Sequence, residues 1–112
     1  MPRRVGLSQA KRIIYSGERI SAKDAGEIGL ADVVVPMDKL EETVMEFAKK
    51  IASKAPLALK RIKAVMNEGI ETDLKSGLKL EQEAVNDLTA TEDFQEGIAA
   101  FLEKRPPKWK GK

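Results

Sequence analysis

The sequence contains neither cysteine nor histidine among its 112 residues. Without cysteine the chain can form no disulfide and has no thiol nucleophile, and without histidine it cannot assemble a Ser–His or Cys–His catalytic pair. Most zinc sites are excluded as well, because cysteine and histidine are the main zinc ligands. The sequence therefore predicts no metal site and none of these forms of nucleophilic catalysis.

Long apolar runs and a concentrated charge of one sign are also missing. No run reaches the roughly 20 residues of a membrane span, and the first residues are not followed by the apolar core of a signal peptide. The 20 Lys and Arg residues are interleaved with 18 Asp and Glu residues, whereas a nucleic-acid footprint needs a concentrated basic face. We expect a cytoplasmic protein that binds neither membranes nor nucleic acids.

Apolar residues recur mostly at helical spacing. The pattern predicts a mainly α fold of about six helices, at residues 7–15, 21–27, 38–51, 56–69, 72–88 and 91–105, with short connections. The β-branched run Asp32–Pro36 predicts one short orphan strand, because no second strand is visible to pair with it. Ser21, Asp38, Thr72 and Thr91 are expected to cap the starts of four of these helices.

The most informative segment is the last 22 residues. Thr91 can accept from the free N–H groups of a helix start, and the two acidic residues after it favour the positive end of the helix dipole. One apolar stripe follows at i, i+4, i+7 and i+8, formed by Phe94, Ile98, Phe101 and Leu102. Pro106-Pro107 stops the helix. The segment predicts a short helix with an exposed aromatic and basic tip.

Phe101 and Lys104 are the candidate binding residues. Because they are three positions apart on the expected helix, an aromatic face and an ammonium group could meet one ligand together. The alternative is that Phe101 simply packs in the core with the rest of its stripe. Trp109, after the two prolines, is expected to pack the tail onto a neighbouring surface, which could belong to another subunit.

Two further features have both a functional and a structural interpretation. Glu81 lies within an apolar stripe, so it could be a general base or could be tied to a basic side chain or backbone donor that fixes a helix pair. Lys60, Arg61 and Lys63 form either a basic cluster for a ligand or an ordinary solvated helix face. We assign no catalytic residue.

Two blocks of the sequence resemble the crotonase superfamily, which includes the enoyl-CoA hydratases and isomerases. They are residues 16–36, SGERISAKDAGEIGLADVVVP, and residues 96–105, EGIAAFLEKR. The resemblance covers nearly the whole chain but only the C-terminal part of such a protein. It implies that residues 1–36 end the crotonase-like α/β core and that residues 37–112 form a helical C-terminal oligomerisation region.

The function that the resemblance implies belongs to the whole enzyme, which would add water to 2-enoyl-CoA to give 3-hydroxyacyl-CoA. In the family, the catalytic glutamates and the backbone oxyanion hole precede the part that this chain resembles, so the chain alone is expected to be inactive. No covalently bound cofactor is implied, and the substrate is a coenzyme A thioester. Phe101 and Lys104 match positions that contact the adenine and phosphate end of coenzyme A.

The resemblance also implies a homo-oligomer, which is trimer-based in the family and a dimer or higher for this chain alone. An alternative of a different class is a non-catalytic, self-associating helical interaction module. In that case the face that normally covers the α/β core would be an exposed apolar patch, and such a patch favours association with a partner.

Overall fold

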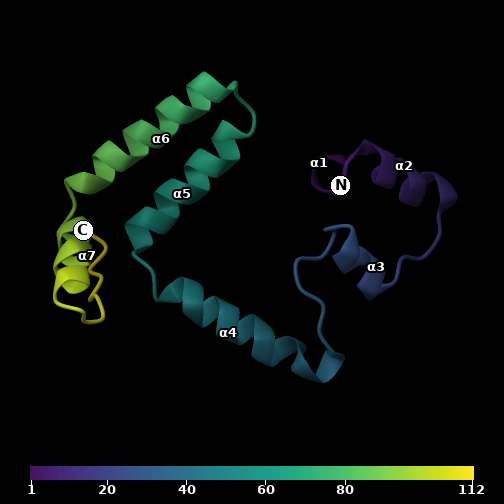
Figure 1. The fold of residues 1–112 in the computed structure, drawn as a ribbon, viewed down its shortest axis with the longest axis horizontal. Coiled ribbons are helices and arrows are strands. Elements are labelled where there is room, and N and C mark those ends of the chain that lie inside the picture. Colours follow the sequence, from purple (N-terminus) through teal and green to yellow (C-terminus); the bar gives the residue numbers. More distant parts are fainter. The chain divides into compact units, whose positions relative to one another are not determined.

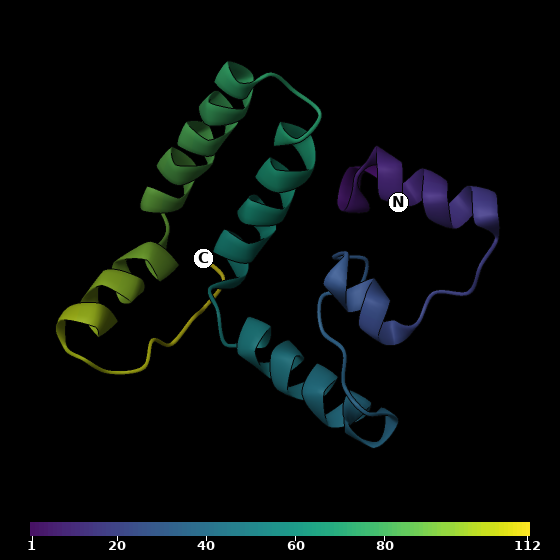
Figure 2. The ribbon, with the colours of Figure 1, turned by 45° about the vertical axis from the view of Figure 1, so that its right-hand side comes forward.

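The structure, a computed structural model, describes all residues from 1 to 112 (Figures 1 and 2). The mainly α fold class is confirmed. The elements are α1 (Pro2–Val5), α2 (Leu7–Ser16), α3 (Ala22–Glu27), a 3₁₀ turn (Met37–Lys39), α4 (Leu40–Ala52), α5 (Pro56–Gly69), α6 (Leu74–Thr89) and α7 (Glu92–Leu102). None of the helices combines the length and the apolar character that a membrane span requires.

The expected strand at Asp32–Pro36 is not formed. Residues 31–32 bend, and residues 33–36 follow without any ladder of strand hydrogen bonds. The β-branched run instead packs locally, since a methyl group added at Gly26 of α3 would lie 3.0 Å from Val34 Cγ2. High strand propensity forms no strand without a partner, because the ladder is the source of its stability.

Two helix starts differ from those expected, and one helix was not expected. Asp73 rather than Thr72 caps α6, and its carboxylate accepts from the Ser76 N–H at 3.1 Å. The 3₁₀ turn, rather than an Asp38 cap, leads into α4. Helix α1, with only four residues, is too short for an apolar period to reveal it. The expected Ser21 cap is confirmed, because its Oγ accepts from the Asp24 N–H at 3.0 Å.

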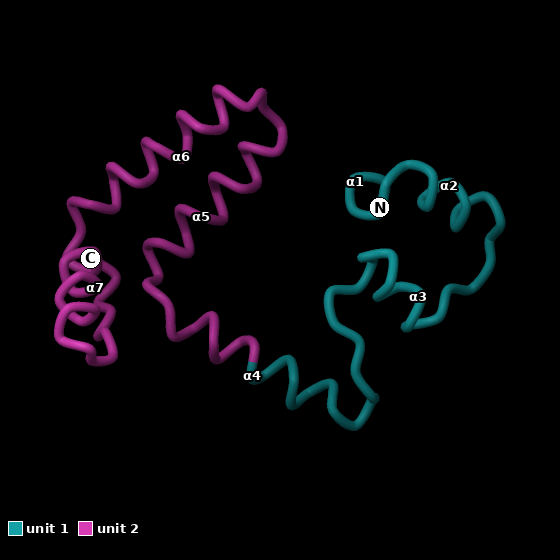
Figure 3. Tube along the Cα trace, viewed as in Figure 1, with its two compact units in different colours: residues 1–46 teal, residues 47–112 magenta.

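The chain divides into two compact units, residues 1–46 and residues 47–112 (Figure 3). Within the first unit, Arg4 Nε donates to the Gly29 carbonyl at 2.8 Å and its guanidinium pairs with the Asp32 carboxylate. Ala10 is the one buried residue of this unit. The division expected after residue 36 stays a prediction.

The second unit contains the antiparallel pair α5 and α6, which lie side by side in Figures 1 and 2. Arg61 of α5 and Asp87 of α6 form an ion pair of 2.5 Å between them. Helix α7 follows α6 after a short turn. Residues 103–112, the tail, then run back along α7, so that the N–H groups of Lys110 and Gly111 reach Asp93. Only Asp93 and Ala100, both in α7, are buried in this unit, so its helices leave much of their apolar surface uncovered.

Candidate functional site

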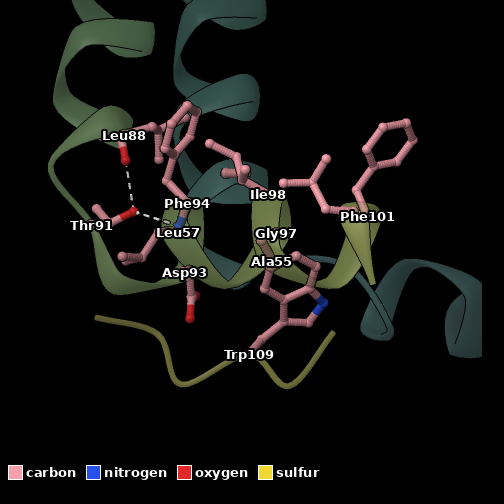
Figure 4. A pocket seen from close by; sticks show the side chains of 12 residues that line it. Ala55, Leu57, Leu88, Thr91, Asp93, Phe94, Gly97, Ile98, Phe101 and Trp109 are labelled. Carbon is pink, nitrogen blue, oxygen red and sulfur yellow. Dashed lines mark hydrogen bonds between the residues drawn. The ribbon is translucent and has the colours of Figure 1, made fainter. Parts of the chain in front are cut away.

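The start of α7 forms as the sequence predicts. Thr91 Oγ1 accepts from the Phe94 N–H at 3.2 Å and donates to the Leu88 carbonyl at 2.7 Å, so one hydroxyl joins the end of α6 to the start of α7 (Figure 4). The apolar stripe of α7 lies beside Leu57 of α5 and Leu88 of α6.

An apolar groove of about 380 Å³ results from this arrangement. Figure 4 shows its lining, in which α5, α6, α7 and the tail all take part. The principal side chains are Leu57, Leu88, Phe94, Ile98, Phe101 and Trp109. Pockets of this size and polarity are typical of sites for small organic ligands.

Phe101 lies at the rim of this groove and is 82% exposed. Within this chain Phe101 therefore does not pack in a core. An exposed aromatic ring can stack on a planar ligand.

Lys104 does not lie on the helix surface with Phe101, contrary to the prediction from spacing. Helix α7 ends at Leu102, and Lys104 has a left-handed backbone with φ of 54°. Its N–H donates to the Phe101 carbonyl at 3.3 Å, and the next N–H, of Arg105, donates to the Ala100 carbonyl at 3.0 Å. This pair of bonds is a Schellman motif. It turns the chain sharply just beyond the exposed aromatic ring.

The tail after this turn is anchored on the same unit, and Trp109 is its main apolar anchor. Its indole Nε1–H donates to the Ser53 carbonyl at 2.8 Å. Its ring lies close to α7, since a methyl group added at Gly97 would be 3.4 Å from Cη2. In this chain Trp109 thus packs against its own unit, and this contact needs no second subunit.

Two acidic residues of α7 hold the tail backbone, and sequence reasoning missed both. Asp93 is 3% exposed, and its two carboxylate oxygens accept from the Lys110 N–H at 2.7 Å and the Gly111 N–H at 3.0 Å. Glu96 accepts from the Lys108 N–H at 2.7 Å and pairs with both Nη atoms of Arg105, at 2.6 and 3.0 Å. For Asp93 the sequence offered only its place in the first helical turn, which suggested dipole stabilisation, and for Glu96 the residue pattern indicated no role.

These contacts perturb the electrostatics of the site. The hydrogen bond from Arg105, together with the one from the Lys108 backbone, lowers the pKa of Glu96 to about 2. The same pairing raises the pKa of Arg105 above its ordinary value. Both groups are therefore fully charged throughout the neutral range.

Acid should loosen this tail attachment. Because the pKa of Glu96 falls from 4.5 to about 2 on folding, its contribution to stability is complete above about pH 4.5 and disappears as the pH falls toward 2. The free energy of unfolding, measured from pH 7 to 2 by circular dichroism in urea, should decline less steeply in Glu96→Gln than in the unmodified chain. The pKa of Asp73 is also lowered, by its hydrogen bonds with Ser76. Its contribution to the free energy of unfolding should therefore decrease equally in both proteins as the pH falls. Identical pH profiles would contradict the assignment.

The remaining sequence candidates contribute no chemistry here. Glu81 is exposed on α6, so it is not the half-buried carboxylate that its place in the stripe suggested. Of the basic cluster, Arg61 is paired with Asp87, and Lys60 and Lys63 are exposed. No group of His, Cys, Asp or Glu residues is arranged to hold a metal ion.

Comparison of this structure with solved structures identifies the class of protein to which the fold belongs. Over 99% of its length, this chain superposes on 43% of the crystal structure of enoyl-CoA hydratase from Bacillus anthracis, with a TM-score of 0.96 and 46% sequence identity. An enoyl-CoA hydratase/isomerase from Mycobacterium paratuberculosis matches with a TM-score of 0.92 and 34% identity, over 99% of this chain and 42% of that one. The chain thus matches the C-terminal helical region of crotonase-fold structures.

Sequence comparison then gives the family. The enoyl-CoA hydratase/isomerase family profile matches residues 1–112, and the chain belongs to this family. It is 42% identical over 110 residues to the 2,3-dehydroadipyl-CoA hydratase of Escherichia coli, covering 98% of this chain and 43% of that protein. It is 39% identical over 105 residues to the short-chain-enoyl-CoA hydratase of Clostridium acetobutylicum, covering 94% and 40%. The chain therefore spans about two fifths of the length of these relatives.

Proposed function

We propose that this chain is the C-terminal helical part of an enzyme that adds water to 2-enoyl-CoA thioesters and yields 3-hydroxyacyl-CoA. The observation that carries the proposal is the match of all 112 residues to the enoyl-CoA hydratase/isomerase family. The relatives named above are hydratases of coenzyme A thioesters, which supports an acyl-CoA substrate. The non-catalytic module considered from the sequence is not favoured, because the relatives that cover nearly the whole chain are enzymes of this kind.

The division of labour within such an enzyme follows from the side chains present. Hydration of an enoyl thioester needs carboxylates that activate water and donors that stabilise the enolate oxygen. We place these groups in the larger part of the family protein that this chain does not span. Residues 1–36 would complete the α/β core, and residues 37–112 would form the helical oligomerisation region. No covalently bound cofactor is part of the proposal.

Phe101 and Lys104 are proposed to bind the adenine and phosphate end of coenzyme A. Three features of the site support this proposal: the 82% exposure of the Phe101 ring, the exposed ammonium of Lys104, and the turn that joins them over only three residues. An aromatic face can stack on adenine, and a lysine is a common point-charge partner of phosphate. The apolar groove continues from Phe101 and could accept a less polar part of the ligand.

Titration calorimetry with coenzyme A tests this assignment. We expect weak binding to the chain, with Kd on the order of 1 mM, because Phe101 and Lys104 supply part of a larger pocket. Phe101→Ala and Lys104→Ala should each weaken binding about fivefold, as expected for one exposed contact of about 1 kcal/mol. Lys108→Ala removes the same charge four residues away and should leave Kd unchanged. Equal losses in all three variants, or an affinity as high as that of a full-length hydratase, would refute the assignment.

We also propose that the protein is a homo-oligomer, trimer-based when the whole enzyme is assembled. Within α5 and α6, large apolar side chains remain exposed, including Ile62, Met66, Leu74 and Leu78. Exposed apolar faces of this kind favour association. Sedimentation velocity at micromolar concentration should show a dimer or larger species, and a purely monomeric chain would count against the proposal.

A further inference from the structure

The backbone of Lys104 is unusual, because it is the one non-glycine residue of this chain with a positive φ, at 54°. Left-handed backbone is unfavourable for a residue with a Cβ atom, and glycine is the usual residue at this position of a Schellman motif. A lysine side chain is too long to stabilise the conformation by a local bond of the kind that Asn forms. The two backbone bonds of the motif offset part of this cost, and contacts of the tail that follows Lys104 add to them.

Glu96 of α7, which lies 9 residues before Arg105, provides such contacts. Its two oxygens receive the two Nη atoms of Arg105 at 2.6 and 3.0 Å, in the two-pronged geometry that is the strongest for this pair. The same carboxylate accepts from the Lys108 N–H at 2.7 Å. The Glu96 side chain thus holds Arg105, which follows Lys104 directly, and Lys108. These two residues lie on either side of Pro106-Pro107.

The two partners are also partly shielded from water. The side chains of Arg105 and Glu96 are 35% and 23% exposed. Those of the Lys110–Glu92 pair are 68% and 59% exposed. Glu103 also pairs with Arg105, at 2.5 Å, but it is 60% exposed and holds no part of the tail backbone. Glu96 therefore holds the chain on both sides of Pro106-Pro107, whereas Glu103 contacts only the side chain of Arg105.

We infer that Glu96 is a positioning residue for ligand binding, which acts by holding Lys104 in its left-handed conformation beside the exposed ring of Phe101. The inference rests on the proposed function, in which Lys104 meets a phosphate of coenzyme A. Without Glu96, the Arg105 guanidinium and the Lys108 N–H lose this acceptor and Lys104 relaxes to an ordinary backbone conformation, while Asp93 and Trp109 still hold the end of the tail. The Lys104 ammonium then loses its fixed place relative to the aromatic ring. Strained residues of this kind are concentrated at ligand-binding sites.

A double-mutant cycle with coenzyme A as the probe distinguishes positioning from a merely structural role. Glu96→Ala should weaken binding to the 112-residue chain about fivefold, as much as Lys104→Ala does. Added to Lys104→Ala, the same change should have no further effect, because Glu96 acts through that lysine. Glu103→Ala, the matched control, should leave Kd unchanged. Equal losses from Glu96→Ala in both backgrounds, or unchanged Kd in Glu96→Ala, would overturn the inference.

Nuclear magnetic resonance supplies a second measurement that needs no ligand. A strong intraresidue cross-peak between the amide and α protons of Lys104 marks its positive φ. This cross-peak should be present in the unmodified chain and in Glu103→Ala, and weak in Glu96→Ala; its persistence in Glu96→Ala would refute the inference. If Glu96→Ala does not fold, Glu96→Gln replaces it in both experiments. If the unmodified chain does not bind coenzyme A, the proposed ligand is wrong, and this measurement still decides whether Glu96 controls Lys104.

Discussion

No turnover of crotonyl-CoA is expected from the 112-residue chain. Hydration requires carboxylates close to the double bond and hydrogen-bond donors directed at the thioester oxygen. In this chain the two carboxylates that are most shielded, those of Asp93 and Glu96, are already occupied by the tail. Glu81 is exposed, and histidine and cysteine are absent. The rate should fall below that of a full-length relative by a factor of 10⁶ or more, on the order of the lower range of enzymatic accelerations.

A steady-state assay that follows loss of the enoyl thioester absorbance measures this directly. The positive control is a full-length relative at the same concentration, for example the enoyl-CoA hydratase from Bacillus anthracis whose structure this chain matches. Turnover within tenfold of that control would show that the catalytic groups lie in this chain, and the proposed division of labour would then be wrong.

Asp93→Ala is expected to be the most destabilising single substitution in the tail attachment. Asp93 is 3% exposed, accepts two backbone N–H groups of the tail, and donates its own N–H to the Lys112 carbonyl at 3.0 Å. Alanine would leave the Lys110 and Gly111 donors without their acceptor. We expect the free energy of unfolding to fall by about 3 kcal/mol, since hydrogen bonds to a charged group contribute about 1.5–3 kcal/mol each.

The chain carries its own reporter for this measurement. Trp109 is the single tryptophan, and it lies in the tail that Asp93 holds, so its fluorescence in a urea titration follows both detachment and unfolding. Glu92→Ala is the matched control, because Glu92 precedes Asp93 and forms an exposed ion pair of 3.1 Å with Lys110. That variant should lose less than about 1 kcal/mol. Similar midpoints for the two variants would show that the Asp93 bonds do not anchor the tail.

Local features of the fold could be predicted because local residues decide them. Ser21 and Thr91 cap their helices as expected, and both bonds join residues three positions apart. The apolar period likewise located α2 to α7 to within a few residues. The strand at Asp32–Pro36 failed for the converse reason, since strand propensity is not sufficient without a second chain segment.

The candidate site was predicted only in part. Phe101 and Lys104 were singled out by residue type and resemblance, but the spacing argument assumed that the helix continued to Lys104. The helix ends two residues earlier, because the N–H groups of Lys104 and Arg105 turn back to the carbonyls of Phe101 and Ala100. Residue type alone does not distinguish a lysine in this left-handed turn from a lysine in the last helical turn, where cations are also favoured.

The sequence by itself determined the helical class, the position of most helices, two of their caps, and the family. Each of these depends on residues within one or two helical turns, or on blocks of residue types in order. The tertiary structure alone decided that Phe101 is exposed, that Trp109 packs on its own unit, and that Asp93 and Glu96 hold the tail. The contacts of Trp109, Asp93 and Glu96 join residues from 9 to 56 positions apart. They form only where the chain turns back on itself.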